Sequence, residues 1–332
     1  MTGARREALR LALAVAMAAL MPMRAGFVFG AEKVVRIGLV GPESPTTMKR
    51  APPAFWARLG ELGWIEGVNL AREERWAQGH IDRLPTLMAE VVSSKIDVLV
   101  TFSTPAAVAA KNATTTVPIV VAAMSDPIGI GVAVSLARPG GNLTGLSLQM
   151  TEGIPGKWLE ILHEALPALQ KVAVIGNPDS PLFTLVRSPL AVGASHLSLK
   201  LRFFPVRNPE ALESTFRQAR AWAQAAIVLT DPMIFQSQRT VIALAEKHHL
   251  PVLYTLPEFV DAGGLISYGA DLTVLFRRAA EYVDRILRGA HPADLPIEQA
   301  SQYKLIVNLK AANGLGLTFP ESLLLRADEV IR

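Results

Sequence analysis

The feature that most constrains the fold is a repeated alternation of short apolar runs with longer amphipathic segments. The apolar runs are rich in Val and Ile, as expected of parallel strands that are covered on both faces. The first of these runs lie at 34–40, 96–102 and 117–123. Between them, 54–62 and 83–93 have the apolar spacing of helices, and the charged stretch 69–76 fits an edge strand. This order predicts a parallel sheet with right-handed crossovers.

The same alternation restarts after a predicted loop at 136–145, which contains the sequence Arg-Pro-Gly-Gly-Asn. Strands are predicted at 171–175, 199–206, 226–230 and 251–254. Helices are predicted between them at 182–197, 209–222 and 234–248. A strand at 265–268, a helix at 272–288 and a strand at 303–307 follow. The predicted fold class is therefore α/β, with two doubly wound parallel-sheet lobes.

The chain has 332 residues, half of them hydrophobic, and no cysteine. This length can bury one or two sizeable cores. The lack of cysteine excludes disulfides, thiolate metal sites and a cysteine nucleophile.

The first thirty residues have the layout of a secretory signal. Arg5, Arg6 and Arg10 precede an apolar run of about eleven residues, and small residues and phenylalanines follow it. The run is too short for a membrane-spanning helix, which needs ~20 residues. We predict a cleaved signal peptide over residues 1–30 and a periplasmic mature protein. The paired arginines leave the general and the twin-arginine export routes both open.

The formal charge of +4 would suit a nucleic-acid or membrane-surface partner. However, residues 1–30 hold four arginines and one glutamate, and without them the charge falls to about +1. Arg277 and Arg278 lie on a predicted helix that also carries Glu281 and Asp284, which is typical of a solvated face of mixed sign. We therefore predict no nucleic-acid partner. With no lipid-attachable thiol after the signal, the mature protein is expected to be freely soluble in the periplasm.

Four predicted strands end in a capping residue followed by proline. The four sequences are Ser103-Thr104-Pro105, Ser125-Asp126-Pro127, Asn177-Pro178 and Asp231-Pro232. Each one alone is explained by ordinary helix capping, with Pro at the first helical position. Open α/β sheets, however, bind ligands at the carboxyl ends of their strands, so two caps from each half could converge on one cleft. A helix start there favours a carboxylate, and Asp126 or Asp231 could accept an ammonium group.

Motifs for catalysis and for cofactor binding are missing from the sequence. The Gly156-Lys157 pair is followed by Trp158, so it does not form a phosphate-binding loop, and 129–131 lacks the third glycine of a dinucleotide fingerprint. The histidines do not have metal-ligand spacing, and Ser147 and Ser195 do not lie in a hydrolase elbow. We predict no enzymatic activity, no metal and no cofactor.

Eight stretches of the chain carry a resemblance to a known family. They are ELGWIEG at 61–67, RW at 75–76, TPAAVAAK at 104–111, DP at 126–127, SLARPGGNLTGLS at 135–147, EFVDAGGLISYG at 258–269, PADLP at 292–296 and NLK at 308–310. Together they resemble the bacterial ABC-transporter substrate-binding proteins of the type I periplasmic-binding-protein fold. The resemblance is to the subfamily that includes tryptophan- and other aromatic-amino-acid-binding members.

The resemblance implies two lobes that capture a small solute in a cleft between them and deliver it to a membrane permease. The predicted lobes are 33–147 with 265–295 and 148–264 with 296–332. The ligand-binding residues that the resemblance implies are Glu43, Ser44, Ser103, Thr104, Ser125, Asp126, Asn177, Asp231, Tyr254 and Tyr268. Pro257 and 101–102 depart from the family's usual residues beside the cleft, which leaves the identity of the ligand open.

We therefore predict a monomeric solute receptor of an ABC importer that closes around its ligand by hinge rotation. The predicted ligand is an amino acid or a related carboxylate, with aromatic ligands included. Tyr254 and Tyr268 are either stacking partners of such a ligand or ordinary half-buried strand residues. Two alternatives stay open: an exported ligand-sensing domain of a signalling receptor, and an exported α/β enzyme that uses Asp126 or Asp231 as a base.

Overall fold

The structure is a computed structural model that describes residues 34–148 and 153–332. The predicted signal peptide over residues 1–30 lies outside the described residues. In the described part of the chain, no helix is both long enough and apolar enough to cross a membrane.

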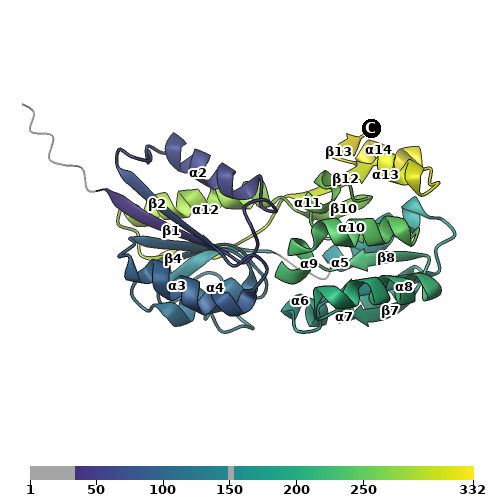
Figure 1. The fold of residues 1–332 in the computed structure, drawn as a ribbon, viewed down its shortest axis with the longest axis horizontal. Helices are drawn as coiled ribbons and strands as arrows, with labels where there is room; N and C mark the ends of the chain where they lie inside the picture. The colour runs from purple at the N-terminus through teal and green to yellow at the C-terminus, as the bar shows by residue number, and fades with distance from the viewer. Residues whose placement is uncertain (1–33, 149–152) are drawn as a thin grey trace, which may run out of the picture. The chain divides into compact units, whose positions relative to one another are not determined.

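The first sheet has six strands within the described residues, all parallel, in the order β11-β5-β4-β3-β1-β2. Its strands are β1 (Val35–Gly41), β2 (Leu70–Trp76), β3 (Val98–Thr101), β4 (Ile119–Met124), β5 (Leu143–Ser147) and β11 (Glu298–Gln299). Helices α2 (Ala51–Glu61) and α12 (Leu272–Leu287) lie side by side on one face, and α3 (Leu84–Ser93) and α4 (Thr104–Ala113) cover the other (Figure 1). We refer to this sheet with its four helices as the first half.

The second sheet has seven strands within the described residues, in the order β13-β12-β10-β9-β8-β6-β7, and its one antiparallel pairing there is between β10 and β12. Its strands are β6 (Lys171–Gly176), β7 (Lys200–Pro205), β8 (Ala225–Val228), β9 (Val252–Tyr254), β10 (Ile266–Ala270), β12 (Tyr303–Asn308) and β13 (Glu329–Ile331).

Helices cover both faces of the second sheet as well. On one face lie α8 (Leu212–Trp222), α9 (Pro232–Gln236), α10 (Gln238–Lys247) and α11 (Glu258–Asp261). On the other face lie α5 (Gly153–Ala165), α6 (Pro181–Leu185), α7 (Arg187–His196), α13 (Leu309–Gly314) and α14 (Glu321–Arg326). Short 3-10 turns are η1 (Ile81–Arg83), η2 (Pro209–Ala211) and η3 (Pro292–Asp294). This sheet with its helices is the second half.

Both sheets follow the same winding rule. The order is β2-β1-β3-β4-β5 in the first and β7-β6-β8-β9-β10 in the second. In the first sheet the second strand is added on one side of β1 and the later strands on the other side, and the second sheet is wound in the same way around β6. The switch points therefore lie between β1 and β3 and between β6 and β8, and doubly wound folds bind ligands at such points. The predicted α/β class with two doubly wound sheets is confirmed, and so is the edge strand predicted at 69–76.

Strand β5 corrects the sequence analysis, which places a loop at 136–145. Its sequence, LTGLS, has no β-branched run, and it contains Gly145. Gly145 has a φ of +139°, and a Cβ there would lie 2.1 Å from the carbonyl oxygen of Val121 on β4. The two backbones approach where the β4–β5 register shifts. Glycine is needed at this position, although its presence favours a loop prediction.

The strand pairings divide the C-terminal part of the chain differently from the predicted lobe boundaries. Strand β10 pairs with β9 in the second sheet, whereas β11 pairs with β5 in the first. The chain therefore crosses between the halves after β10 and again after β11. Asp271 ties these two crossings together, because it caps α12 through a 2.8 Å bond from Thr273 N and pairs with Lys304 Nζ at 2.7 Å.

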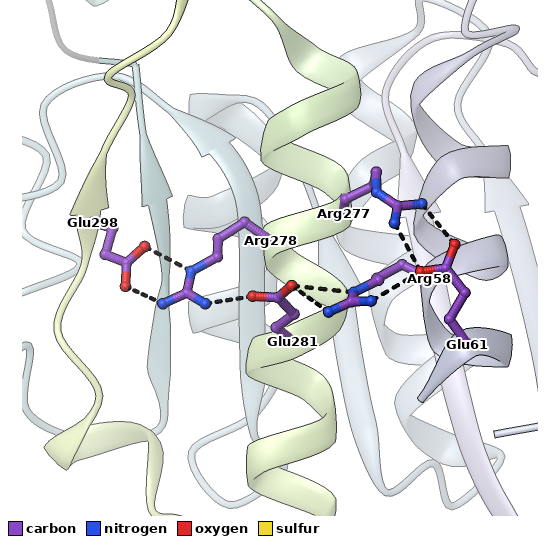
Figure 2. Close-up of polar contacts among 6 residues, drawn as sticks. All are labelled: Arg58, Glu61, Arg277, Arg278, Glu281 and Glu298. Carbon is purple, nitrogen blue, oxygen red and sulfur yellow. Dashed lines mark hydrogen bonds and ion pairs between the residues drawn. The ribbon is translucent and has the colours of Figure 1, made fainter. Parts of the chain in front are cut away.

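The mixed-sign face predicted around Arg277 and Arg278 is confirmed. Its ion pairs join α2, α12 and β11 across the first half (Figure 2). The pairs are Arg277 with Glu61 at 2.8 Å, Arg58 with Glu61 at 2.9 Å and with Glu281 at 2.8 Å, and Arg278 with both Glu281 and Glu298, the latter at 2.6 Å. Every carboxylate in this network faces at least one guanidinium group.

Candidate ligand-binding site

A cavity of about 350 Å³ lies between the carboxyl ends of strands from both sheets. The volume falls within the range of small-molecule sites, roughly 300–1,000 Å³. Residues that follow β1, β3 and β4 line it from the first half, and residues that follow β6, β8 and β9 line it from the second. Much of the remaining wall is apolar and includes Met48, Phe102, Met124, Leu148, Leu182, Met233, Phe235, Leu256 and Leu272.

The start of helix α4 forms the hydroxyl-bearing wall of the first half. Ser103 is the N-cap residue, and its Oγ accepts a bond from Ala106 N at 3.4 Å. Thr104 Oγ1 accepts a bond from Ser125 N at 3.0 Å, which holds the helix start against the end of β4. All three predicted residues line the cavity, and the predicted cap at Ser103 is confirmed. A helix N-terminus in a cavity wall favours an anionic group.

The pair Asn177 and Asp231 forms the facing wall in the second half. Asp231 caps α9, since its Oδ1 accepts a 2.8 Å bond from Ile234 N, and its Oδ2 accepts a 2.6 Å bond from Asn177 Nδ2. Burial raises the pKa of Asp231 above its usual range. Asn177 does not cap a helix: its Oδ1 accepts from Asp179 N at 3.0 Å, and α6 begins only at Pro181. One of the two caps predicted here is thus confirmed, while both residues line the cavity.

Glu43 follows β1 and brings a carboxyl group into the cavity from the first half. The residue is only 5% exposed, and within the described residues its Oε2 atom has no hydrogen-bond partner. Burial raises the pKa of Glu43 to about 8, and the nearby carboxyl groups of Asp231 and Glu258 add to this effect. The loop is held by its own backbone, because Glu43 O accepts a 2.9 Å bond from Gln78 N.

Ser44 and Asp126 were predicted to line the cleft but lie outside the cavity wall. The Ser44 hydroxyl bonds within its own loop, to Thr46 Oγ1 at 2.9 Å and to Thr47 Oγ1 at 2.8 Å. No helix follows Asp126; the residue has a φ of +45°, and its Oδ1 accepts a 2.9 Å bond from Gly129 N in a turn. The capping pattern at 125–127 therefore stabilises a turn.

The two tyrosines also lie outside the cavity wall. Tyr254 is 1% exposed and stacks on Phe259 inside the core, with ring centroids 4.8 Å apart. Tyr268 stacks on Tyr303 at 5.8 Å, and its carbonyl oxygen accepts a bond from Trp158 Nε1 at 2.9 Å. Both tyrosines fit the alternative of ordinary strand residues.

Several lining residues were missed by sequence reasoning. Asn208 and Pro209 repeat the cap-proline pattern after β7, and Asn208 Oδ1 accepts a 3.0 Å bond from Ala211 N. The same signal could have found this pair. Thr230 and Thr255, whose hydroxyl oxygens lie 2.9 Å apart, follow β8 and β9 without a proline beside them, so no motif marks them.

Across 34–148 and 153–332, no group of three or more His, Asp or Glu side chains is placed to hold a metal ion. The expectations of no metal, no cofactor and no catalysis remain predictions.

Two doubly wound halves with a cavity at the carboxyl ends of their strands have the architecture of bilobal solute-binding proteins. A match to a protein-family model identifies the family within this class. The chain belongs to the ABC transporter substrate binding protein family, whose model matches residues 48–331.

Individual relatives agree with this assignment. A tyrosine-binding protein of Clostridioides difficile is 28% identical over 306 residues, which are 90% of this chain and 86% of that protein. A conserved domain protein from Vibrio cholerae is 27% identical with a TM-score of 0.84, over 90% of this chain and 100% of the other. An ABC domain from Streptococcus pneumoniae in complex with L-Trp is 26% identical with a TM-score of 0.83, over 90% and 99%.

Proposed function

We propose that this protein is the periplasmic receptor of an ABC importer and that it binds an amino acid, with aromatic side chains accepted, in the cavity between its halves. The observation that carries this proposal is the composition of the cavity wall. A hydroxyl-bearing helix start lies on one side of the cavity, buried carboxyl and amide groups lie on the other, and apolar side chains form much of the remaining wall. The tyrosine-binding and L-Trp-bound relatives support an amino acid as the ligand.

The carboxylate of the ligand would lie at the start of α4. Ser103 and Thr104 offer hydroxyl groups there, and the helix dipole favours negative charge. The side chain of the ligand would contact Phe102, Met233 and Phe235. Phe102 is held in a T-shaped contact with Phe276 at 5.1 Å, so this part of the wall is preformed.

Closure of the two halves around the ligand would convert binding into a signal for the permease. Contacts that would break on opening include Thr47 Oγ1 to Gln236 Oε1 at 3.3 Å and Arg50 Nη1 to Asp261 Oδ2 at 2.7 Å. A ligand that contacts both walls favours the state in which these contacts are made. The protein would act in this cycle as a monomer and without chemical turnover.

A thermal-shift screen of the mature protein tests this function. The screen includes L-tyrosine, L-tryptophan, the other amino acids and aromatic carboxylic acids. We expect at least one amino acid to raise the midpoint of unfolding in proportion to the logarithm of its concentration. No shift with any of these compounds would contradict the proposal, as would chemical conversion of a bound compound detected by mass spectrometry.

A further inference from the structure

We propose that Gln236 is a positioning residue that holds the two halves together and so sets the affinity for the ligand without contacting it. This inference rests on the proposed function, since it concerns closure of the same cavity. Gln236 is the last residue of α9 in the second half and lies outside the cavity wall. Its side chain contacts the first half at Gly79 and at Thr47. We refer to these three residues as the clamp.

The packing of Gln236 on Gly79 leaves no room for a side chain on the glycine. A Cβ atom at residue 79 would lie 2.8 Å from Gln236 Cγ. Gly79 has a φ of +86°, and its N–H donates to Pro42 O at 2.8 Å, which fixes this turn to the backbone that follows β1. The glycine therefore brings the backbone of the first half against a side chain of the second half.

The contact of Thr47 with Gln236 is the end of a chain of hydroxyl groups. Thr47 Oγ1 donates to Gln236 Oε1 at 3.3 Å. Ser44 Oγ lies 2.8 Å from Thr47 Oγ1 and 2.9 Å from Thr46 Oγ1. A hydroxyl group has one proton, so Ser44 donates to Thr47, and Thr46 donates to Ser44. Ser44, which is 8% exposed and lies outside the cavity wall, thus orients the hydroxyl group that reaches the second half.

Both sides of the clamp are joined directly to the cavity wall. The hydroxyl chain lies between Glu43 and Met48, which both line the cavity. Helix α9 is only five residues long; its N-cap Asp231 lines the cavity, and Gln236 ends it. A ligand that draws the two walls together therefore also brings the clamp contacts together. Because the clamp does not touch the ligand, it favours closure by the same free energy with every ligand.

A second connection between the halves differs from the clamp in its exposure. The side chains of Arg50 and Asp261 pair at 2.7 Å but are 57% and 26% exposed, so solvent and salt screen this ion pair. Gln236 and Thr47 are uncharged and half-buried. The clamp should therefore favour the closed state at every ionic strength, and we assign the larger effect to it.

Binding kinetics of the full mature protein with L-tyrosine and with L-tryptophan test the inference. Gln236→Ala removes both clamp contacts. We expect the affinity for each ligand that binds to fall by the same factor, roughly 10-fold, as for loss of a hydrogen bond with its packing. The loss should appear as faster dissociation with a nearly unchanged association rate, because the clamp forms after the ligand enters. Ser44→Ala should give a smaller loss in the same direction, since Thr47 then lacks the donor that orients it.

Two controls separate closure from folding. Arg277→Gln removes an ion pair with Glu61 inside the first half, and it should leave affinity and dissociation rate unchanged. Urea unfolding of ligand-free Gln236→Ala should show a midpoint close to that of the wild type. A loss of affinity with both ligands that only followed a lower urea midpoint would mean a structural role and would contradict the inference.

A cysteine pair tests whether the clamp forms in solution. The chain has no cysteine, so Gly79→Cys combined with Gln236→Cys introduces its only two thiols. A Cβ at residue 79 would lie 3.1 Å from the Cβ of residue 236, close to the roughly 3.5–4.5 Å of disulfides. With oxidised glutathione, we expect the bond to form in the ligand-free protein and to form faster with ligand present. The cross-linked protein should take up no ligand until it is reduced.

Unchanged dissociation of both ligands from Gln236→Ala would overturn this inference. A loss of affinity for only one of them would do the same, because a clamp acts on closure and not on recognition. So would absence of the disulfide with and without ligand. Each of these outcomes leaves the proposed function intact. Failure of every amino acid and carboxylate to bind would contradict the proposed function, whereas disulfide formation in the ligand-free protein would still test the clamp.

Discussion

Acidic side chains in this protein have opposite surroundings on the α2–α12 face and in the cavity. On the α2–α12 face, hydrogen bonds from Arg277 and then Arg58 lower the pKa of Glu61 to about 2 (Figure 2). In the cavity, burial without a cation raises the pKa of Glu43 to about 8. The same residue type is thus held as a carboxylate in one region and as a neutral acid in the other.

The contrast distinguishes acidic residues that stabilise the fold from acidic residues that we expect to contact a ligand. Paired surface carboxylates tie two helices and a strand together, and each contributes little because solvent screens the pair. Unpaired buried carboxyl groups oppose stability, so their presence at the edge of a cavity points to a compensating ligand. Three variants test this division, and they are ordered here by expected effect.

The largest effect is expected from Asp231→Asn. The amide oxygen can still cap α9, but the negative charge opposite Glu43 is lost. We expect amino-acid affinity to fall on the order of 100-fold, as for loss of a charge-assisted hydrogen bond in a buried site. Isothermal titration at pH 8 measures this loss, and unchanged affinity would rule out Asp231 as a ligand contact.

A double variant serves as the control for Asp231→Asn. The single change places two amide groups against each other, because Asn177 Nδ2 donates to Asp231 Oδ2 in the wild type. Asn177→Asp combined with Asp231→Asn restores a carboxyl–amide bond at the same place. If the charge is what the ligand senses, the double variant should recover part of the affinity.

The intermediate effect concerns stability and pH. The folded state holds the Glu43 proton up to about pH 8, whereas in an unfolded chain it is lost near the ordinary pKa of 4.5. The folded state therefore binds more protons, and this residue makes stability fall as pH rises from about 5 to about 8. Glu43→Gln should be more stable than the wild type at pH 8, by on the order of 2 kcal/mol, and similar to it near pH 4.

Urea unfolding at pH 4, 6 and 8 without ligand measures this difference. Glu258→Gln is the matched variant, because burial also raises the pKa of Glu258 to about 8 and its Oε2 lacks a partner within the described residues. Its stability should change in the same direction. Wild-type and Gln profiles that run parallel across this range would mean that both carboxyl groups are charged in the folded protein.

The smallest effect is expected from Glu298→Gln on the surface. Hydrogen bonds from Arg278 lower the pKa of Glu298, so this pair stabilises the fold above the ordinary carboxyl pKa and is lost in acid, opposite to Glu43. Both side chains are 37% exposed, so we expect a loss of less than about 1 kcal/mol that shrinks further in high salt. Ligand affinity should not change. A tenfold change would contradict the proposal that acidic residues of the α2–α12 face stabilise the fold and do not take part in ligand binding.

The sequence predicted the local elements well. Apolar runs and helical spacing located the strands of both sheets except β5, β11 and β13, because a buried strand leaves an apolar run in the sequence. Strands β11 and β13 have only two and three residues and are mostly polar or half-buried, so they leave no such run. Caps at Ser103 and Asp231 were also predicted, since a capping side chain bonds to an N–H only three residues away. Asp126 shows the limit of that reasoning, because the same dipeptide serves equally well in a turn.

The sequence by itself determined that this chain forms two α/β sheets with capped helices at the strand ends, because strand burial patterns and helix caps are local. Only the tertiary structure decided which of these side chains share a cavity. It buried Tyr254 against Phe259 and placed Glu43 in the same cavity as Asp231, where no donor within 34–148 and 153–332 reaches Glu43 Oε2. Burial and charge balance depend on residues from β1 and β8, which lie far apart in sequence and meet only when both sheets are packed.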